Sequence, residues 1–217
     1  MKKMLLATLV ALSCTSVYAE PTAVLKVTGT LTNASCTPEL SNGGVIDYGT
    51  INLRDLSATE DNNLGDKTIS LTITCPVNTK VAFTTQDDKS ASNAGLAPTV
   101  NGSTKTDAYY QYGVGLTDGG VKIGDYGLWI TGVTVDGASA DAIISNNDLT
   151  SWAKGVEMRS DGVSNITAAA TGTLQPLAFR AATFDMKANL VIEDTTTLAI
   201  TDDTKLDGQT TFTLVYL

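Results

Sequence analysis

The sequence has 217 residues, of which 42% are hydrophobic and 17% are charged, and its formal net charge is −9. A chain with such an acidic excess repels nucleic acid and anionic lipid surfaces, so neither is an expected partner. It contains no histidine, the commonest general base and metal ligand, and no carboxylate pair stands in a recognisable catalytic setting. The sequence therefore predicts no enzymatic activity, no catalytic residue, no metal and no cofactor.

The first nineteen residues have the pattern of a secretory signal peptide. Lys2 and Lys3 form a positive segment, residues 4–12 are apolar, and a small residue, Ala19, stands at the cleavage position. The apolar segment is too short to be a permanent membrane span, and no later segment predicts one. A lipoprotein signal with Cys14 as the lipidated residue is the competing interpretation. We expect cleavage after Ala19, and export to the periplasm or to a fimbrium at the cell surface.

Cleavage at that site leaves two cysteines, Cys36 and Cys75. An even number of cysteines in a compartment that oxidises thiols favours a disulfide. The bond would close a loop of about forty residues, which stabilises the fold by about 4 kcal/mol in the chain-entropy model. A metal or redox pair is the rival interpretation; the wide spacing and the lack of histidine argue against it.

Short runs of alternating apolar and polar residues predict β-strands along the remaining chain. These runs are residues 23–31, 69–75, 81–83, 128–135, 188–192 and 212–216. Clusters rich in Asn, Asp and Gly separate them and predict turns. The polar residues 86–105 are predicted to form a mobile loop. Because a helical period appears nowhere at length, we expect an all-β sandwich in a single domain, residues 20–217.

Three patterns, in this order, resemble the pilin subunits of chaperone–usher fimbriae. GTLTNASC is an alternating strand that runs from Gly29 into Cys36. VIDYGTI, at 45–51, is a short strand with a glycine, followed by LTITC at 71–75. The last residues, GQTTFTLVYL, place Tyr216 second from the end. The stretches CTPELSNGGVIDYGTI, IGDYGLWI and LDGQTTFTLVYL are also similar to an enterobacterial family of pilin-like periplasmic proteins of unassigned function.

The resemblance implies an immunoglobulin-like, pilin-type β-sandwich that lacks its final strand. A periplasmic pilus chaperone, and later another subunit, would supply that strand, with an usher as a further partner. It implies that the chain's last strand binds the chaperone or the next subunit through Phe212, Leu214, Tyr216 and Leu217.

The same resemblance makes Ala23, Leu25 and Val27 a candidate donor segment that would complete another copy. Two glycines that are common in pilins are replaced in this sequence, by Ala23 in the donor segment and by Thr204 near the carboxyl end.

The expected function is that of a non-enzymatic fimbrial or fimbria-like subunit, handled by a chaperone through strand complementation and serving cell adhesion. The alternative is a periplasmic or surface binding module, an adhesin, that uses an enlarged central region of about residues 108–171. Trp129, Trp152 and nearby tyrosines could stack on sugars there, although aromatic residues on alternating strands more often pack in the core.

Overall fold

The computed structural model describes residue 23 and residues 25–29, 35–146 and 148–217, and the chain separates into units 1–33 and 34–217. In the first unit, residue 23 and residues 25–29 are exposed and have no regular secondary structure. The predicted signal peptide and part of the strand predicted at 23–31 lie outside the described residues. The fold is therefore that of the second unit.

The second unit consists almost entirely of β-strands, which confirms the all-β prediction. The strands are β1 (Thr37–Leu40), β2 (Asn62–Thr79), β3 (Val81–Asp87), β4 (Thr99–Val100), β5 (Ser103–Thr104), β6 (Tyr112–Gly113), β7 (Gly124–Val135), β8 (Ala138–Asn146), β9 (Ala153–Lys154), β10 (Ser164–Ala170), β11 (Phe179–Ile192) and β12 (Thr210–Tyr216). The helical elements are a four-residue α-helix, α1 (Thr195–Leu198), and the 3-10 turns η1 (Ser41–Gly44), η2 (Leu53–Asp55), η3 (Ser90–Ser92) and η4 (Ala108–Tyr110).

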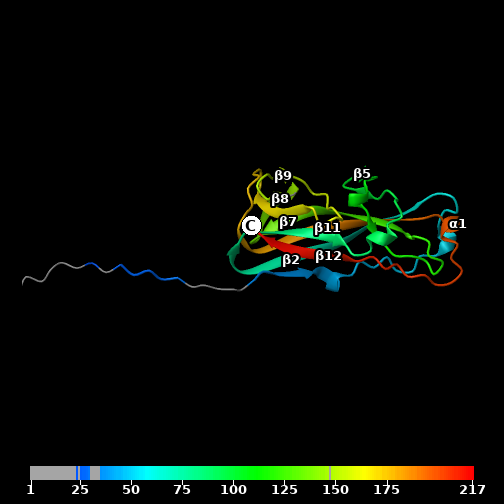
Figure 1. Cartoon of the computed structure of the whole chain (residues 1–217), viewed down its shortest axis with the longest axis horizontal. Coiled ribbons are helices and arrows are strands. Elements are labelled where there is room, and N and C mark those ends of the chain that lie inside the picture. The colour runs from blue at the N-terminus through cyan, green and yellow to red at the C-terminus, as the bar shows by residue number, and fades with distance from the viewer. Residues whose placement is uncertain (1–22, 24, 30–34, 147) are drawn as a thin grey trace, which may run out of the picture. The chain divides into compact units, whose positions relative to one another are not determined.

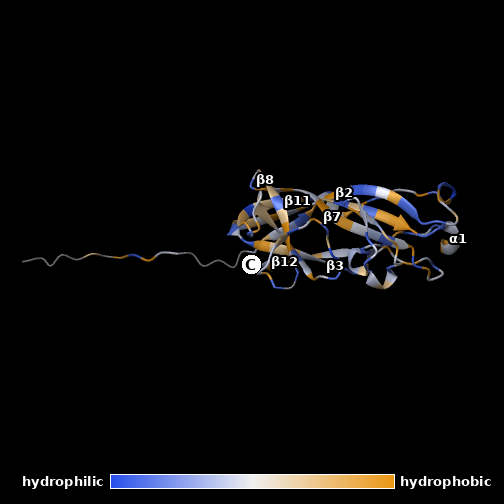
Figure 2. Ribbon diagram, turned by 90° about the horizontal axis from the view of Figure 1, so that it is seen from above, coloured by the Kyte–Doolittle hydropathy of each residue, from blue (hydrophilic) through white to orange (hydrophobic). Residues whose placement is uncertain are grey.

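Ten of these strands form one antiparallel sheet. Its main order is β1-β2-β11-β7-β8-β10-β3-β12, with β6 beside β7 and β9 beside β8, while β4 and β5 form a separate small hairpin. The long strand β11 pairs with β2 on one side and β7 on the other over most of its length. Figure 2 shows hydrophobic residues, in orange, along strands of this sheet, β7 among them.

The sheet folds over on itself into two layers, as in a sandwich. Strands β7 and β8 pair only at residues 133–135 and 138–140, around a tight turn, and β8 then continues along β10. The ring of Phe83 in β3 meets that of Phe184 in β11 edge-on, with centroids 5.0 Å apart, although three strands separate them in the sheet order. Residues of the two layers thus share one buried core, whose largest fully buried side chains include Tyr112, Phe83, Phe179, Phe184, Leu71, Ile73 and Ile143.

The disulfide between Cys36 and Cys75 is present, with an S–S distance of 2.05 Å, and it confirms that prediction. Both cysteines are buried in the core. The bond joins the chain just before β1 to the middle of β2. Because β1 is a strand of only four residues at the edge of the sheet, the disulfide fixes the edge where hydrogen bonding alone is weakest.

Residues 86–105 form an ordered excursion, which differs from the mobile loop that we predicted. Strand β3 runs through Gln86 and Asp87, and the excursion then carries η3 and the β4–β5 hairpin. Val100 in the hairpin is buried, and a Cβ on Gly127 of β7 would lie only 2.4 Å from its Cγ2 atom. The hairpin therefore packs tightly on β7. Residue 127 of β7 must be a glycine, because any side chain there would collide with the hairpin.

The short strand expected at residues 45–51 is extended but pairs with no other strand of the described chain. Burial alternates over the first part of this run, where Ile46 and Tyr48 are half-buried between exposed residues, and the alternation ends at Gly49 and Thr50, which are both exposed before the half-buried Ile51. The pattern therefore identified a face that packs on the sheet, and the expected ladder partner is missing within the described residues.

Candidate functional site: an apolar groove between two extended segments

An open groove of about 800 Å³ runs along the second unit. Its floor consists of hydrophobic side chains from β2, β7, β11 and the segment before β7, namely Ile69, Val114, Ile123, Tyr126, Leu128, Ala188, Leu190 and Ile192. It extends from Leu40 and Phe212 to Leu198 in α1, and Figure 1 places α1 at the opposite end of this unit from the C-terminus. Two extended segments flank the floor, and we call them the first lip and the second lip.

The first lip is residues 44–51. Tyr48 fastens it to the sheet, since its hydroxyl donates to the carbonyl of Ala188 in β11 at 3.0 Å and lies 3.3 Å from the carbonyl of Gly65 in β2. Burial raises the pKa of Tyr48 to about 12, so the hydroxyl stays protonated and remains a donor. The N–H of Gly49, at a φ of +69°, donates to the Asp47 carboxylate at 2.7 Å and turns the chain locally.

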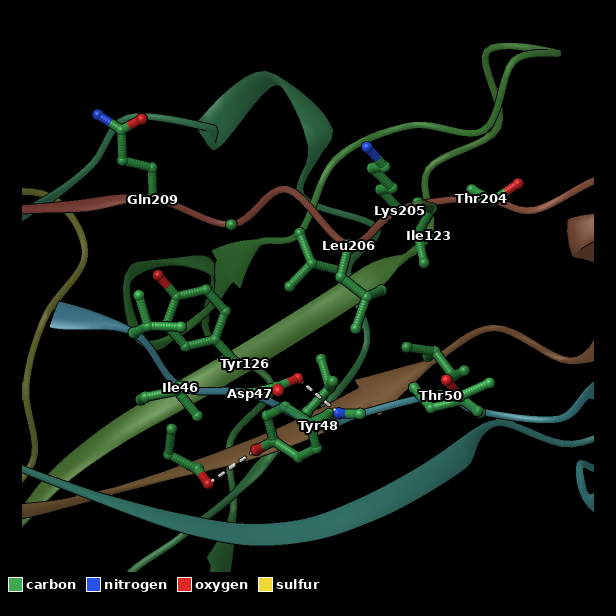
Figure 3. Close-up of a pocket in the computed structure, with 18 of the residues that line it drawn as sticks. Ile46, Asp47, Tyr48, Thr50, Ile123, Tyr126, Thr204, Lys205, Leu206 and Gln209 are labelled. Carbon is green, nitrogen blue, oxygen red and sulfur yellow. Dashed lines mark hydrogen bonds between the residues drawn. The ribbon is translucent and has the colours of Figure 1, made fainter. Parts of the chain in front are cut away.

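The second lip is residues 202–209, between α1 and β12. No residue of it belongs to a strand within the described chain. The N–H of Asp207 donates to the carbonyl of Val114 at 2.8 Å, and the carbonyl of Gln209 accepts from the N–H of Asp88 at 3.0 Å. Figure 3 shows Leu206 and Lys205 of this lip together with Ile46 and Tyr48 of the first lip and with Tyr126 of the floor.

The groove leaves apolar surface and main-chain groups accessible together. Val45 and Leu206, one on each lip, are 57% and 38% exposed. Neither lip contributes to a strand ladder in the described part of the chain, although Asp207 and Gln209 of the second lip make main-chain hydrogen bonds to neighbouring loops. Apolar surface beside backbone that lies outside a strand ladder is an arrangement that can accept an extended segment.

Two buried carboxylates lie behind the second lip. Asp125 of β7 is completely buried and accepts from the N–H groups of Ala94 at 3.1 Å and Leu96 at 2.8 Å. Asp87 of β3 accepts from the N–H groups of Lys89 and Gly113. Burial raises the pKa of Asp125 to about 6, opposed by these amide donors, and burial also raises the pKa of Asp87. Both side chains hold residues 88–96 against the sheet.

The structure places the four residues of the expected binding strand unequally. Phe212 lines the groove and Leu214 packs against the core, both half-buried. Tyr216 and Leu217 are exposed, by 51% and 40%, and do not line the groove. Strand β12 pairs with β3 along one of its two edges, from Thr210 to Tyr216. The groove is therefore centred on residues that precede β12, which sequence reasoning treated only as a turn.

The candidate donor residues Ala23, Leu25 and Val27 belong to the first unit. They have no regular secondary structure, and Leu25 and Val27 are 88% and 90% exposed. The central region of about 108–171 contributes β7, β8 and β10 to the main sheet and so supplies much of the core. Within it Trp129 is buried, which leaves its ring unavailable for stacking on a ligand.

Within the described residues, no cluster of three or more His, Cys, Asp or Glu side chains is arranged to hold a metal ion. Among the same residues, no helix has the length and hydrophobicity needed to cross a membrane.

Comparison with known proteins finds similarity over the part of the chain that contains the first lip. Residues 25–127 match a family described as "Protein of unknown function (DUF1120)", and this stretch contains the disulfide, the first lip and the start of β7. The chain is 26% identical over 222 residues to Protein GltF of Escherichia coli (strain K12), covering 89% of this chain and 87% of that protein. It is 31% identical over 137 residues to Uncharacterized protein YhcF of the same organism, covering 54% of this chain and 58% of that protein.

Proposed function

We propose that the protein is a non-enzymatic subunit of a fimbria or fimbria-like assembly, exported to the periplasm, whose groove accepts a β-strand from a partner. The groove carries this proposal, because its apolar floor lies between two lips of extended backbone. A strand between the lips would bury alternate side chains on the floor and pair its peptide groups with those of the lips.

The finer description of the fold belongs to the same proposal. In a pilin-type immunoglobulin-like sandwich that lacks its final strand, the gap lies beside the last strand of the chain. Here the groove reaches Phe212 of β12 and continues along the second lip. The added strand would take the place of the missing one.

The proposed donors are a periplasmic pilus chaperone during export and a second copy of the chain after assembly, with an usher as a further partner. Ala23, Leu25 and Val27 suit the second role, since they alternate along a segment without regular secondary structure whose Leu25 and Val27 are almost fully exposed. A strand of this pattern would present Leu25 and Val27 to the groove floor and Lys26 to solvent.

Site-specific photo-crosslinking in the periplasm tests the proposal. A photoreactive amino acid replaces Val45 or Leu206, one on each lip, and Val77 serves as the matched control because it is 47% exposed but does not line the groove. We expect both lip positions to crosslink to a two-domain chaperone or to residues near Leu25 of a second copy, identified by mass spectrometry. Val77 should give neither product.

A groove that accepts no strand would give a different result. A monomer that is stable alone, and whose lip positions give no crosslink beyond those of the Val77 control, would contradict the proposal.

A second candidate function, a surface binding module, is favoured by one pair of rings. Tyr109 and Tyr110 in η4 are half-buried, with ring centroids 4.6 Å apart. The guanidinium carbon of Arg159 lies 4.1 Å from the Tyr109 centroid, and Lys105 Nζ lies 4.9 Å from that of Tyr110. Each ring combines an apolar face with a polar hydroxyl, which is the chemistry that a sugar ligand would need, although the two cations each cover one face. A glycan array on wild type and Tyr110→Ala tests this function.

A further inference from the structure

The second lip is attached to the molecule by the loop that follows β3. The N–H of Asp88 donates to the carbonyl of Gln209 at 3.0 Å, and the Asp88 carboxylate accepts from Gln209 Nε2 at 3.1 Å and from Thr211 Oγ1 at 2.8 Å. One aspartate therefore contacts the main chain and the side chain of the lip's last residue and also the start of β12.

An ion pair adds a second attachment. Lys89 Nζ lies 2.5 Å from Asp207 Oδ2, two residues before Gln209. The main chain of Asp207 is close to the segment after β6, since its N–H donates to the carbonyl of Val114 and a Cβ on Gly115 would lie 3.3 Å from Asp207 Cβ. Gly115 has a φ of +101°, which a side chain would strain.

The loop itself is fixed firmly to the sheet. Asp87 and Asp125 hold it through the main-chain amides described above, and both carboxylates are buried. Ser92 Oγ donates to the carbonyl of Lys89 at 2.8 Å and accepts from the N–H of Gly115 at 3.0 Å. Asp88 and Lys89 thus extend from a rigid base toward the lip.

The two lips are attached differently. Tyr48 binds the first lip directly to carbonyls of β2 and β11. The second lip has main-chain hydrogen bonds at Asp207 and Gln209, and its other contacts to the loop after β3 are made by side chains at the surface, because both residues are exposed. Surface contacts of this kind are weaker and more sensitive to salt than buried ones. The second lip is therefore the side of the groove whose position can change at least cost.

From these contacts we infer that Asp88 and Lys89 are positioning residues that hold the second lip and so set the aperture of the groove. The inference deepens the proposed function. That Asp88 and Lys89 position the lip does not depend on the proposed function; that the aperture controls strand binding does. The loop lies outside the floor, so the aperture is controlled by residues that line no part of the groove.

Amide hydrogen exchange on the full-length protein measures the lip directly and needs no partner. In Asp88→Ala and in Lys89→Asp we expect the amide of Asp207, which donates to the carbonyl of Val114, to exchange at least about fivefold faster than in wild type, as for the loss of a hydrogen bond of about 1 kcal/mol. The double variant Lys89→Asp, Asp207→Lys restores opposite charges and should recover much of the protection. Lys154→Ala is the matched control, because it removes an ion pair with Asp141, 2.7 Å long, away from the groove.

A general loss of stability would affect the whole sheet. Thermal midpoints of the lip variants should therefore lie within the shift given by Lys154→Ala, and exchange in β11 should stay unchanged. Unchanged exchange of the Asp207 amide in both single variants would overturn the inference, as would acceleration that extends equally through β11.

A binding arm uses a synthetic peptide of residues 20–33 as the probe. If wild type binds it, Asp88→Ala should increase its dissociation rate by about fivefold. An unchanged dissociation rate beside faster lip exchange would show that the lip does not set the aperture. If wild type binds no peptide, the donor role in the proposed function fails, while the exchange result still decides whether Asp88 and Lys89 position the lip.

Discussion

The backbone N–H of Cys36 donates a 2.7 Å hydrogen bond to the hydroxyl of Tyr216, 180 residues further along the chain. The bond joins the residue before β1 to the last residue of β12, and these strands are the two edges of the main sheet. The two edges therefore meet beyond the Phe212 end of the groove. The Cys36–Cys75 disulfide ties this junction to β2.

Tyr216→Phe should remove this junction without altering the ring. We expect the free energy of unfolding to fall by about 0.5–1.5 kcal/mol, the usual net contribution of one hydrogen bond. Urea unfolding of the mature protein measures it. Thr213→Ser, at an exposed position of the same strand, is the control and should leave stability unchanged. Equal midpoints for Tyr216→Phe and wild type would show that the hydroxyl does not contribute.

Leu214→Ala should destabilise the protein through the core. Leu214 is half-buried and packs against the main hydrophobic cluster, so we expect a loss of about 1–3 kcal/mol, the lower part of the range for buried leucines. Thermal unfolding and the amount of protein recovered from the periplasm are the measurements. A midpoint shift no larger than that of Thr213→Ser would contradict the packing of Leu214.

Reduction of the disulfide should weaken the edge at β1. We expect intact protein to gain the mass of two hydrogens on reduction, and Cys36→Ser to cost about 2–5 kcal/mol of unfolding free energy. Free thiols in periplasmic material, measured under non-reducing conditions, would be inconsistent with the bond. Comparing Cys36→Ser with the Cys36→Ser, Cys75→Ser double variant separates loss of the bond from exposure of a free thiol.

Asp125 should make stability depend on pH in a defined direction. Its pKa is about 6 in the folded protein and 3.8 ordinarily, so between these values the folded state retains a proton that the unfolded state has released. The stability from this difference is fully present below pH 3.8 and is lost as the pH rises through 6. The pKa difference corresponds to about 3 kcal/mol.

Urea unfolding at pH 4 to 7 measures this effect. As the pH rises from 4 to 7, we expect the free energy of unfolding to fall further in wild type than in Asp125→Asn. This comparison does not depend on the absolute stability of the variant. Asp118→Asn, which removes an exposed carboxylate, is the control for a change in net charge. A parallel pH dependence in wild type and Asp125→Asn would contradict the raised pKa.

The alternating patterns predicted strands well where the chain packs on one face of the sheet. Residues 69–75 lie in β2, and Leu71 and Ile73 from that run are fully buried. The pattern at 45–51 has the same physical cause, but the strand predicted there pairs with no other strand of the described chain. Alternation indicates which side chains are buried and does not indicate where peptide groups find hydrogen-bond partners. For the first lip, the sequence therefore indicates only which side chains pack against the sheet.

The second lip and the excursion before β6 depend on contacts distant in sequence. Residues 86–105 looked mobile because they are polar, yet Asp125, some thirty residues away, orders them through their main-chain amides. The contacts of Asp88 with Gln209 and Thr211 span more than 120 residues. No local pattern encodes such pairs, so the sequence predicted the all-β class and the disulfide, and its resemblance to pilins implied a groove, but not the residues that line it.

Because both lips lie outside the strand ladders of the described chain, they are also where we expect proteolysis of the isolated protein to begin. Proteases bind their substrates as extended strands, and exposed segments outside a ladder are preferred sites of cleavage. The surfaces that would receive a partner are thus the surfaces that a protease would reach first. If the proposed partner strand binds between the lips, it would cover both segments in the same step. The fraction of protein that survives would then depend on the ratio of the rate of partner binding to the rate of proteolysis.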